Sequence, residues 1–299
     1  TGNSLYNNLS FTGGTKTSNY NISLTRNDEK EIMIGSGYEK TNLTVKTSNK
    51  ISNWLTLELN TRLSDYNLNG AGTSGGRLSA AVQYHPAAGF SDFVDTNLTN
   101  ADNFDTESQF ITNPVKLIND DYRRSKNLMV NVSGALTVKF SNNFNYRFEY
   151  GNQYVVNTNK HFYGINTYEA FSYGTQPLAS IAKTDTKSYR MANILTYSKK
   201  DFLPGNNINV MVGEELNSSK TEIVTSSSKY FPKYITAESA LAMMTLGLAD
   251  PNVTTIYPDN KLSSFFGRVS YDYKGKYLSS VTFRADGSSK FAPQNQWGY

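Results

Sequence analysis

Few residues of this chain have the types and spacing that catalysis requires. The two histidines, His85 and His161, are expected in different long loops, and neither has a His or Cys neighbour at metal-ligand spacing. The absence of cysteine excludes disulfide scaffolds, thiolate metal sites and cysteine nucleophiles. The adjacent Glu214 and Glu215 would point to opposite faces of a strand, so they cannot act together on one substrate. We therefore expect no enzyme activity, no catalytic residue, no metal site and no cofactor.

Two further features could indicate nucleotide or nucleic-acid binding. The stretch from Gly70 to Gly75 matches a dinucleotide fingerprint as text, but it follows an amphipathic strand and lacks the βαβ unit that the fingerprint needs. We interpret it as a flexible glycine-rich loop. The net charge of +4 comes from 29 basic and 25 acidic residues spread along the chain, with no long basic run. Nucleic acid is therefore not a predicted partner.

The composition favours a β-rich fold. Only 38% of the residues are hydrophobic, yet the chain has 21 tyrosines and 16 phenylalanines. Disordered chains are poor in aromatic residues, so disorder of the whole chain is not expected. No stretch approaches the roughly 18 consecutive apolar residues of a membrane helix. Any role in a membrane must come through strands.

Alternation with a period of two is the clearest pattern in the sequence. From Leu128 to Phe140 every second residue is apolar or glycine, and the pattern resumes from Phe144 to Val156 after a short link. About ten strands are predicted in this way: Leu5–Thr12, Tyr20–Arg26, Thr41–Ser48, Trp54–Ser64, Leu128–Phe140, Phe144–Val156, Tyr189–Lys199, Ile208–Asn217, Leu262–Tyr273 and Tyr277–Asp286.

The connections between these strands alternate between short and long along the whole chain. Residues 141–143 and 274–276 form short links, whereas about sixty residues separate the fourth strand from the fifth. Short turns on one rim and long loops on the other are typical of bacterial outer-membrane barrels, whose long loops face the outside. The pattern predicts an all-β, antiparallel transmembrane barrel with short periplasmic turns. Short helices are expected within two long loops, at Arg77–Tyr84 and Ala237–Gly247.

The polar face of the predicted strands carries charged residues that a barrel would direct into its lumen. A charge facing lipid costs about 2–4 kcal/mol near the midplane, whereas the interior is hydrated or plugged by protein. In a soluble protein the same face would be the wet exterior. The residues predicted to face the lumen are Glu58, Arg62, Lys139, Arg147, Glu149, Arg268 and Arg284.

Aromatic residues of the long loops are candidates for contacts with a ligand or a lid. Planar rings can stack on sugars or pack on peptides, but they also form small cores within long loops, and packing is the favoured interpretation. These candidates are Tyr84, Phe90, Phe162, Tyr163, Tyr168, Phe171 and Tyr173.

One segment near the C-terminal end resembles a characteristic segment of the SusC/RagA-like TonB-dependent transporters of Bacteroidota. It runs from Phe283 to Phe291 and reads FRADGSSKF, and QWGY follows at 296–299. The residues that carry the resemblance are Arg284, Asp286, Gly287, Ser288, Ser289, Phe291, Trp297 and Gly298, and a structural role is expected for them.

The resemblance implies a barrel of 22 strands in the outer membrane of a Gram-negative bacterium, filled by an N-terminal plug. It implies import of glycans or peptides, a SusD-like lipoprotein over the outer mouth, and the TonB-ExbB-ExbD system as the energy source. About ten of the 22 strands would lie in this chain. We expect residues 1–299 to be one partial barrel domain, without the plug, the first strand and the C-terminal strands.

Alternatives from other classes of protein remain open. A soluble β-sandwich that acts as a cell-surface binding or adhesin module would keep the strands, although it has no reason to alternate short and long connections. A carbohydrate-active enzyme on a β scaffold should bring acids together in one cleft. A passive porin would have no plug. Peptide and glycan cargo cannot be separated by these residues.

Overall fold

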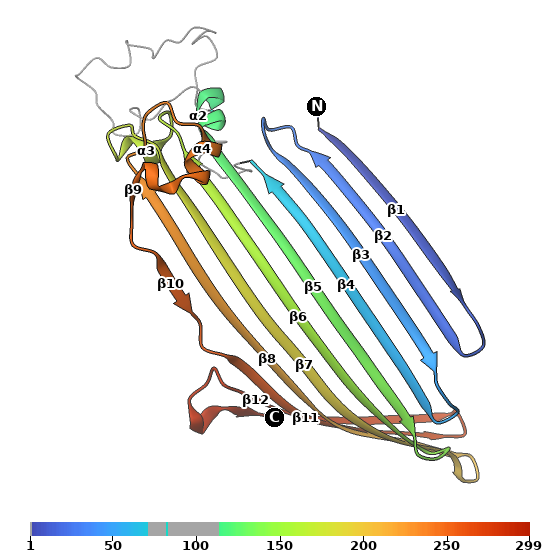
Figure 1. The fold of residues 1–299 in the computed structure, drawn as a ribbon. Coiled ribbons are helices and arrows are strands. Elements are labelled where there is room, and N and C mark those ends of the chain that lie inside the picture. The colour runs from blue at the N-terminus through green and yellow to red at the C-terminus, as the bar shows by residue number, and fades with distance from the viewer. Residues whose placement is uncertain (1, 71–81, 83–113) are drawn as a thin grey trace.

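The chain forms one large antiparallel sheet, in which most strands pair with their neighbours in the sequence (Figure 1). The computed structural model describes residues 2–70, 82 and 114–299. Ten long strands build the sheet: β1 (Asn3–Gly14), β2 (Ser18–Lys30), β3 (Gly37–Lys50), β4 (Leu55–Asn69), β5 (Asp121–Lys139), β6 (Phe144–Tyr163), β7 (Leu178–Leu203), β8 (Asn206–Lys229), β11 (Asn260–Tyr273) and β12 (Tyr277–Ser288). The sheet is open, because β1 and β13 (Trp297–Gly298) lie at its two ends and do not pair with each other.

All ten strands predicted from the alternation are present, and most are longer than predicted. β7 has 26 residues and β8 has 24, against roughly 9–11 for a tilted membrane-spanning strand. The prediction that His161, Phe162 and Tyr163 lie in a long loop is wrong, because all three belong to β6. The hydrogen-bonded ladder between β5 and β6 continues to the pair Asp121 and Tyr163, well beyond the apolar alternation.

Short turns join the strands at one end of the sheet, and the longer connections lie at the other end (Figure 1). We call these the short-turn end and the long-loop end. At the turn between β11 and β12, Lys274 and Gly275 have φ angles of 56° and 67°, a conformation that matches the twist of the flanking strands.

Short helices and strands occupy the long connections. The predicted helix at Ala237–Gly247 is present as α4 (Ala237–Ala242) and the 3₁₀ turn η3 (Met244–Leu246). The predicted helix at Arg77–Tyr84 falls almost wholly outside the described residues. The remaining small elements were not predicted: α2 (Pro114–Asp120), α3 (Tyr168–Phe171), η4 (Pro293–Asn295), β9 (Leu248–Ala249) and β10 (Val253–Ile256), the last two of which pair with β8. No helix in the described ranges combines the length and the apolar character needed to cross a membrane.

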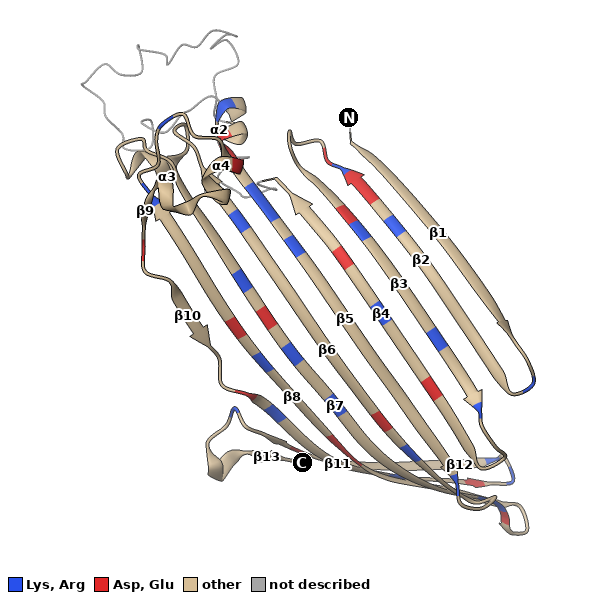
Figure 2. Cartoon of the chain, viewed as in Figure 1, with Lys and Arg blue, Asp and Glu red and all other residues tan. Residues whose placement is uncertain are grey.

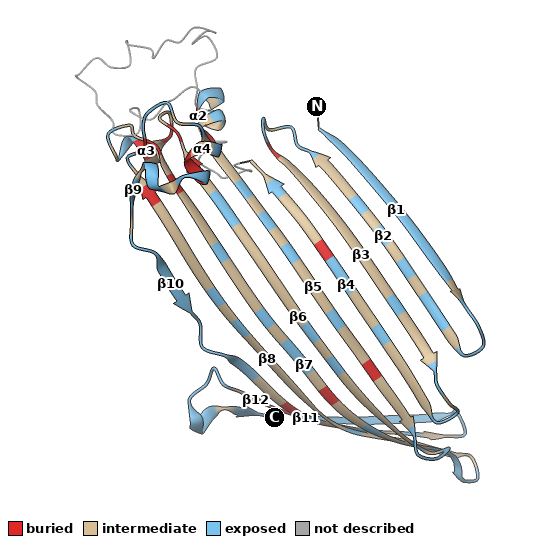
Figure 3. Ribbon diagram, in the orientation of Figure 1, coloured by how far each residue is buried: buried red, intermediate tan, exposed pale blue. Residues whose placement is uncertain are grey.

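The strand register assigns every side chain to one of two faces. Residues that oppose each other in an antiparallel pair point to the same face. One row of opposed residues runs Glu58, Ala135, Glu149, Ala192, Glu215, Ser264 and Asp286 across seven strands. We call the face that carries this row the hollow face and the opposite one the outer face. Exposed and half-buried positions alternate along the strands accordingly (Figure 3).

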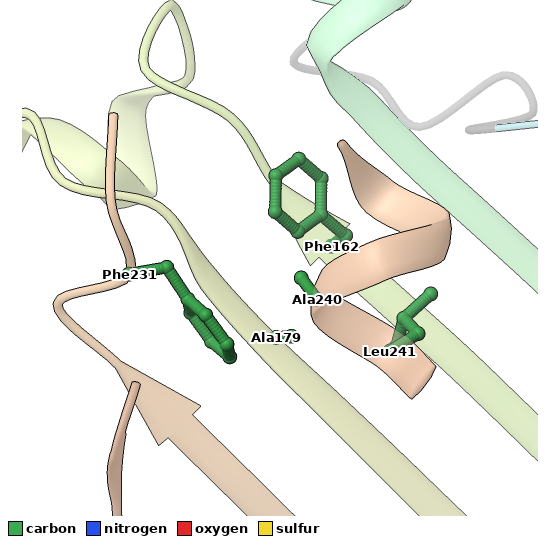
Figure 4. Close-up of a cluster of buried hydrophobic side chains, with 5 residues drawn as sticks. All are labelled: Phe162, Ala179, Phe231, Ala240 and Leu241. Atoms are coloured by element: carbon green, nitrogen blue, oxygen red, sulfur yellow. The ribbon is translucent and has the colours of Figure 1, made fainter. Parts of the chain in front are cut away.

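A small apolar core lies at the long-loop end, on the outer face. Phe162 of β6 and Ala179 of β7 oppose each other in the register, and they pack with Phe231, Ala240 and Leu241 (Figure 4). Phe231 and Ala240 are fully buried. Thr236 caps α4 by accepting a hydrogen bond from the backbone N–H of Ser239, which helps this short helix to form. The core fixes the connection between β8 and β11 to the outside of the sheet.

Candidate functional site

The hollow face encloses a concave space of about 1010 Å³. Its lining comes from β1, β2, β3, β4, β5, β6, β7, β8 and β11, because the sheet curves around it. Much of the lining is uncharged and polar, and includes Asn21, Asn60, Asn131, Gln153, Asn217 and Ser219. Two arginines and two glutamates of the lining approach one another in the middle of the strands, and Glu215 lies beside them.

A chain of ion pairs crosses β4 to β8 on the hollow face. Arg147 donates to Glu58 at 2.7 Å and to Glu149 at 2.7 Å. Arg190 donates to Glu149 at 2.8 Å and to Glu215 at 2.6 Å. We call Glu58, Arg147, Glu149, Arg190 and Glu215 the charge ladder. Acidic and basic members alternate along it, so the ladder nearly neutralises its own charge.

Small residues make room for the ladder. Ala135 lies in the register between Glu58 and Glu149, and Ala192 lies between Glu149 and Glu215. Both alanines are buried, with exposed fractions of 7% and 0%. A larger side chain at either position would occupy the space through which an arginine reaches the neighbouring glutamate. The alanines are therefore part of the reason why the bridges can form.

The same face continues on β11 and β12 with a third arginine. Arg284 donates to Asp286 at 2.8 Å and to the hydroxyl of Ser264 at 3.1 Å. Its guanidinium group also lies over the ring of Phe266, 5.8 Å from the ring centre. Ser264 is fully buried, so its hydroxyl group depends on such partners. Arg284 is thus held by a carboxylate, a hydroxyl group and an aromatic face.

The seven residues that the sequence placed on the lumen side all lie on the hollow face. Three of them belong to the charge ladder or border its rows: Glu58, Arg147 and Glu149. The register places Arg62, Lys139, Arg268 and Arg284 on the same face through their opposed residues Asn131, Asn145, Thr282 and Phe266. Arg190 and Glu215 were missed, although the alternation around Leu195 and Leu216 already separates their face from the apolar one.

The candidate loop aromatics do not gather at one place. Phe162 is buried in the outer-face core, as the packing interpretation expects. Tyr163 lies on the hollow face and its ring is 3.8 Å from that of His161, measured between centres. Tyr168 and Phe171 belong to α3, and Phe171 is 52% exposed. Tyr84 and Phe90 lie outside the described residues.

Tyr173, the last candidate, contacts the end of β8. Its ring meets that of Tyr230 edge-on at 5.7 Å, and the ammonium group of Lys229 lies 5.7 Å from its centre. Lys229 also donates to Asp250 at 2.8 Å. This hydrogen bond raises the pKa of Lys229 above its ordinary value. Tyr173 thus helps to hold the connection between β8 and β11 in place.

The motif near the C-terminal end makes backbone and ring contacts. A Cβ atom on Gly287 would lie 2.9 Å from the indole of Trp297, so only glycine fits beneath this ring. Trp297 also stacks on Phe265 at 6.0 Å. The hydroxyl group of Ser289 accepts from the backbone N–H of Lys261 at 2.8 Å and donates to the carbonyl of Asp259 at 3.1 Å. Gly298 pairs with Asp286, Ser288 lies at the end of β12, and Phe291 is exposed.

The middle of the hollow face presents a polar wall in which the charge ladder nearly neutralises its own charge. Each carboxylate of the charge ladder accepts a hydrogen bond from a guanidinium group. Among the described residues no group of three or more His, Cys, Asp or Glu side chains could hold a metal ion.

Comparison with known proteins relates the chain to one class of membrane receptor. No protein-family model matches it. TonB-dependent receptor P26 of Formosa agariphila is 24% identical over 99% of this chain and 29% of its own length. TonB-dependent receptor SusC of Bacteroides thetaiotaomicron is 49% identical over 13% of this chain, which is 4% of its own length. The resemblance to SusC-like TonB-dependent receptors is therefore confirmed over nearly the whole chain.

The fold is that of a section of such a receptor's barrel. A chain of the RagAB peptide transporter superposes with a TM-score of 0.75 at 15% identity, covering 99% of this chain and 33% of that chain. The antiparallel sheet predicted from the alternation is thus confirmed, as an open segment of barrel wall. The chain spans about 29% of the length of receptor P26.

Proposed function

We propose that this chain is part of the wall of an outer-membrane, TonB-dependent transporter that imports glycans or peptides together with a SusD-like lipoprotein. The observation that carries the proposal is the difference between the two faces of the sheet. The outer face is apolar and uncovered over the middle of the strands, and the hollow face is polar and charged at the same level. Lipid outside and a hydrated or plugged lumen inside account for both.

The outer face exposes more apolar surface than a water-soluble sheet tolerates. Val132, Val212, Phe265 and Val269 are each between 45% and 50% exposed, and they lie on three different strands, β5, β8 and β11. Contiguous apolar patches of more than a few hundred Å² mark contacts with membranes or other proteins. In a β-sandwich a second sheet would cover this face. The uncovered face favours the barrel over the soluble binding module.

We call the apolar outer-face stretch of the strands the apolar band. Its height fits a bilayer. On β5 the outer-face residues from Leu128 to Phe140 are all apolar or glycine. At about 3.4 Å per residue and a tilt near 40°, this stretch rises roughly 30 Å, which is the thickness of a hydrocarbon core. The long-loop end would lie outside the cell and the short turns in the periplasm.

The hollow face supports a role as the lumen wall. The charge ladder would meet the plug or the passing cargo with side chains that are already held in place. Because acids and bases alternate along the charge ladder, this part of the wall would offer hydrogen bonds without a strong field of one sign. Amide and hydroxyl groups of the lining suit cargo that is rich in the same groups, which both glycans and peptides are.

The partner and the cargo are inferred from the relatives. SusC and the RagAB peptide transporter point to a surface lipoprotein over the outer mouth and to energy from the TonB-ExbB-ExbD system. Tyr168, Phe171 and Tyr173 lie at the long-loop end, where such a lipoprotein or the cargo would arrive. These aromatics are the proposed contacts of this chain with the lid.

The proposal is tested with the full-length protein that contains residues 1–299. It should fractionate with the outer membrane and run as a heat-modifiable band. Cells should accumulate labelled oligosaccharides or labelled peptides only when the protein, TonB and the SusD-like lipoprotein are all present. Recovery of the full-length protein in the soluble fraction would overturn the proposal, as would uptake that does not require TonB.

A further inference from the structure

Basic side chains gather on the outer face, directly beyond the apolar band on the long-loop side. They come from four adjacent strands, and Figure 2 shows basic positions in the long-loop halves of β5 to β7. We call the following residues the basic belt: Arg124, Lys126, Lys160, Lys183, Lys187 and Lys220. All six are exposed.

The register places these residues on one face, in rows of opposed residues that run from the row of Arg124 to the row of Val130. Arg124 opposes Lys160, and Lys187 opposes Lys220. Lys126 opposes Thr158, which in turn opposes Lys183. On β5 the belt begins one outer-face position beyond Leu128, and on β7 it begins one position beyond Tyr189. The belt therefore borders the apolar band without a gap on these two strands.

The excess of basic over acidic residues lies on the outer face. Over the length of strand that the belt spans, the outer face of β5 to β8 holds two acids, Asp185 and Glu222, against the six bases of the belt. The hollow face carries one base beside these levels, Arg123, which is paired with Asp121 at 3.1 Å. Its other side chains there are uncharged: Ser125, Asn127, Asn157, Asn159, Thr184, Thr186, Ser219 and Thr221. A charge needed only for solubility has no reason to keep to one face.

Four of the six belt residues form no ion pair with a described carboxylate, and one of them, Lys187, instead lies 5.7 Å from the ring centre of Tyr154. Lys126 and Lys183 have weak partners, with Asp65 at 3.9 Å and Asp185 at 3.2 Å. Within the described part of the chain no carboxylate forms an ion pair with Arg124, Lys160 or Lys220. By contrast, the outer-face charges on β2 and β3 pair among themselves, with Arg26 donating to Glu39 at 2.8 Å.

We propose that the basic belt binds the phosphate groups of anionic lipid headgroups in the leaflet that surrounds the long-loop end. This inference rests on the proposed membrane location of the sheet. The apolar band would contact the acyl chains, and the belt would lie at the level of the headgroups. Lysine and arginine stems can lie along apolar surface while their charged ends reach the phosphates. Cargo in the lumen cannot reach this face.

The core around Phe231 borders the basic belt on the side of the long-loop end. Phe162 and Ala179 are the next outer-face residues beyond Lys160 and Ile181 on β6 and β7, and α4 packs over them. The belt thus lies between an apolar band and a folded cap. A headgroup layer of limited height fits this space, whereas an extended polyanion would have to cross the cap.

The test uses the full-length protein in detergent and native mass spectrometry with phosphatidylglycerol as the probe and phosphatidylcholine as the neutral comparison. The variant combines Arg124→Gln, Lys160→Gln and Lys220→Gln. The control combines Lys16→Gln, Lys200→Gln and Lys276→Gln, which remove equal charge from exposed positions near the short-turn end. Heat-modifiable mobility confirms that both variants fold.

The belt variant should bind phosphatidylglycerol roughly tenfold more weakly than the parent protein, and added salt should weaken the parent's binding. The control should bind as the parent does. Equal binding by belt variant and parent, or an equal loss in the control, overturns the assignment. Displacement of the lipid by excess inorganic phosphate would show an anion site instead of a lipid site. A parent protein that is absent from the outer membrane overturns the proposed function as well, so the two failures are distinguishable.

Discussion

Arg190 of β7 donates to Glu149 of β6 at 2.8 Å, although the two residues are not opposed in the register. The residue opposite Arg190 is Gly151, and the residue opposite Glu149 is Ala192. The diagonal contact is possible because both of these neighbours are small. The other end of the same guanidinium group reaches Glu215 of β8. One side chain therefore ties three strands together on the hollow face.

Replacing Arg190 should loosen these three strands. Arg190→Met leaves Glu215 without its guanidinium partner, and Glu215 is only 16% exposed. We expect a loss of about 1 kcal/mol in the free energy of unfolding, at the low end for charged hydrogen bonds because Arg190 itself is 47% exposed. The midpoint of urea unfolding, followed by heat-modifiable mobility of the full-length protein, measures it. Arg190→Lys should recover only part of the loss, since an ammonium group lacks the planar fork. Full recovery by lysine would argue against the two-sided bridge.

A glycine beside the third arginine offers a second test. A Cβ atom on Gly213 would lie 2.6 Å from the ring of Phe266 and 2.8 Å from the backbone oxygen of Asn193. Gly213→Ala should therefore displace Phe266, over which Arg284 lies, at a cost of about 1–3 kcal/mol in the free energy of unfolding. Gly267→Ala is the matched control, because its Cβ atom would meet nothing closer than 3.6 Å. Equal urea midpoints for the two variants would contradict the packing described for Phe266.

The sequence predicts the strands best where one face is apolar. Along β5 the alternation identifies Leu128 to Phe140, but the strand begins at Asp121. Beyond the apolar band the outer-face residues are Lys126 and Arg124, so both faces become polar and the period of two disappears. The backbone ladder does not depend on this contrast, and it continues. The strand ends were therefore missed because the basic belt makes the outer face as polar as the hollow face.

The partners within the site were less accessible to sequence reasoning. Alternation shows that Glu214 and Glu215 point to opposite faces, and this is confirmed by the opposed residues Phe265 and Ser264. It does not show that Glu215 meets Arg190, because that contact depends on the register between β7 and β8. In the same way, the packing of Phe162 against Phe231 joins segments far apart in the sequence.

Two adjacent residues of β5 test the assignment of the faces. Val132 is on the outer face near the middle of the apolar band, and Asn131 lines the hollow. Val132→Arg should lower the yield of heat-modifiable protein in the outer membrane, since a lipid-facing arginine costs about 2–4 kcal/mol near the midplane. Asn131→Arg introduces the same side chain on the hydrated face and should assemble almost normally. If the outer face were exposed to water instead of lipid, Val132→Arg should be tolerated as well as Asn131→Arg, because an exposed valine in water can be replaced by arginine without such a cost.

The core on the outer face should hold the connection between β8 and β11 without supporting the barrel as a whole. Phe231 is fully buried there, so Phe231→Ala should remove about 3–5 kcal/mol of local packing and expose the segment around α4 to protease. The heat-modifiable mobility should stay unchanged, because the strand ladders extend far beyond this core. Phe171→Ala removes an equal ring from a 52% exposed position and should leave the cleavage pattern as it is. Limited proteolysis of the full-length protein in detergent, followed by mass spectrometry, locates the cuts. If Phe231→Ala is cut no faster than Phe171→Ala, the cap is held by contacts other than this core, and the upper boundary that it sets for the basic belt would have to be reconsidered.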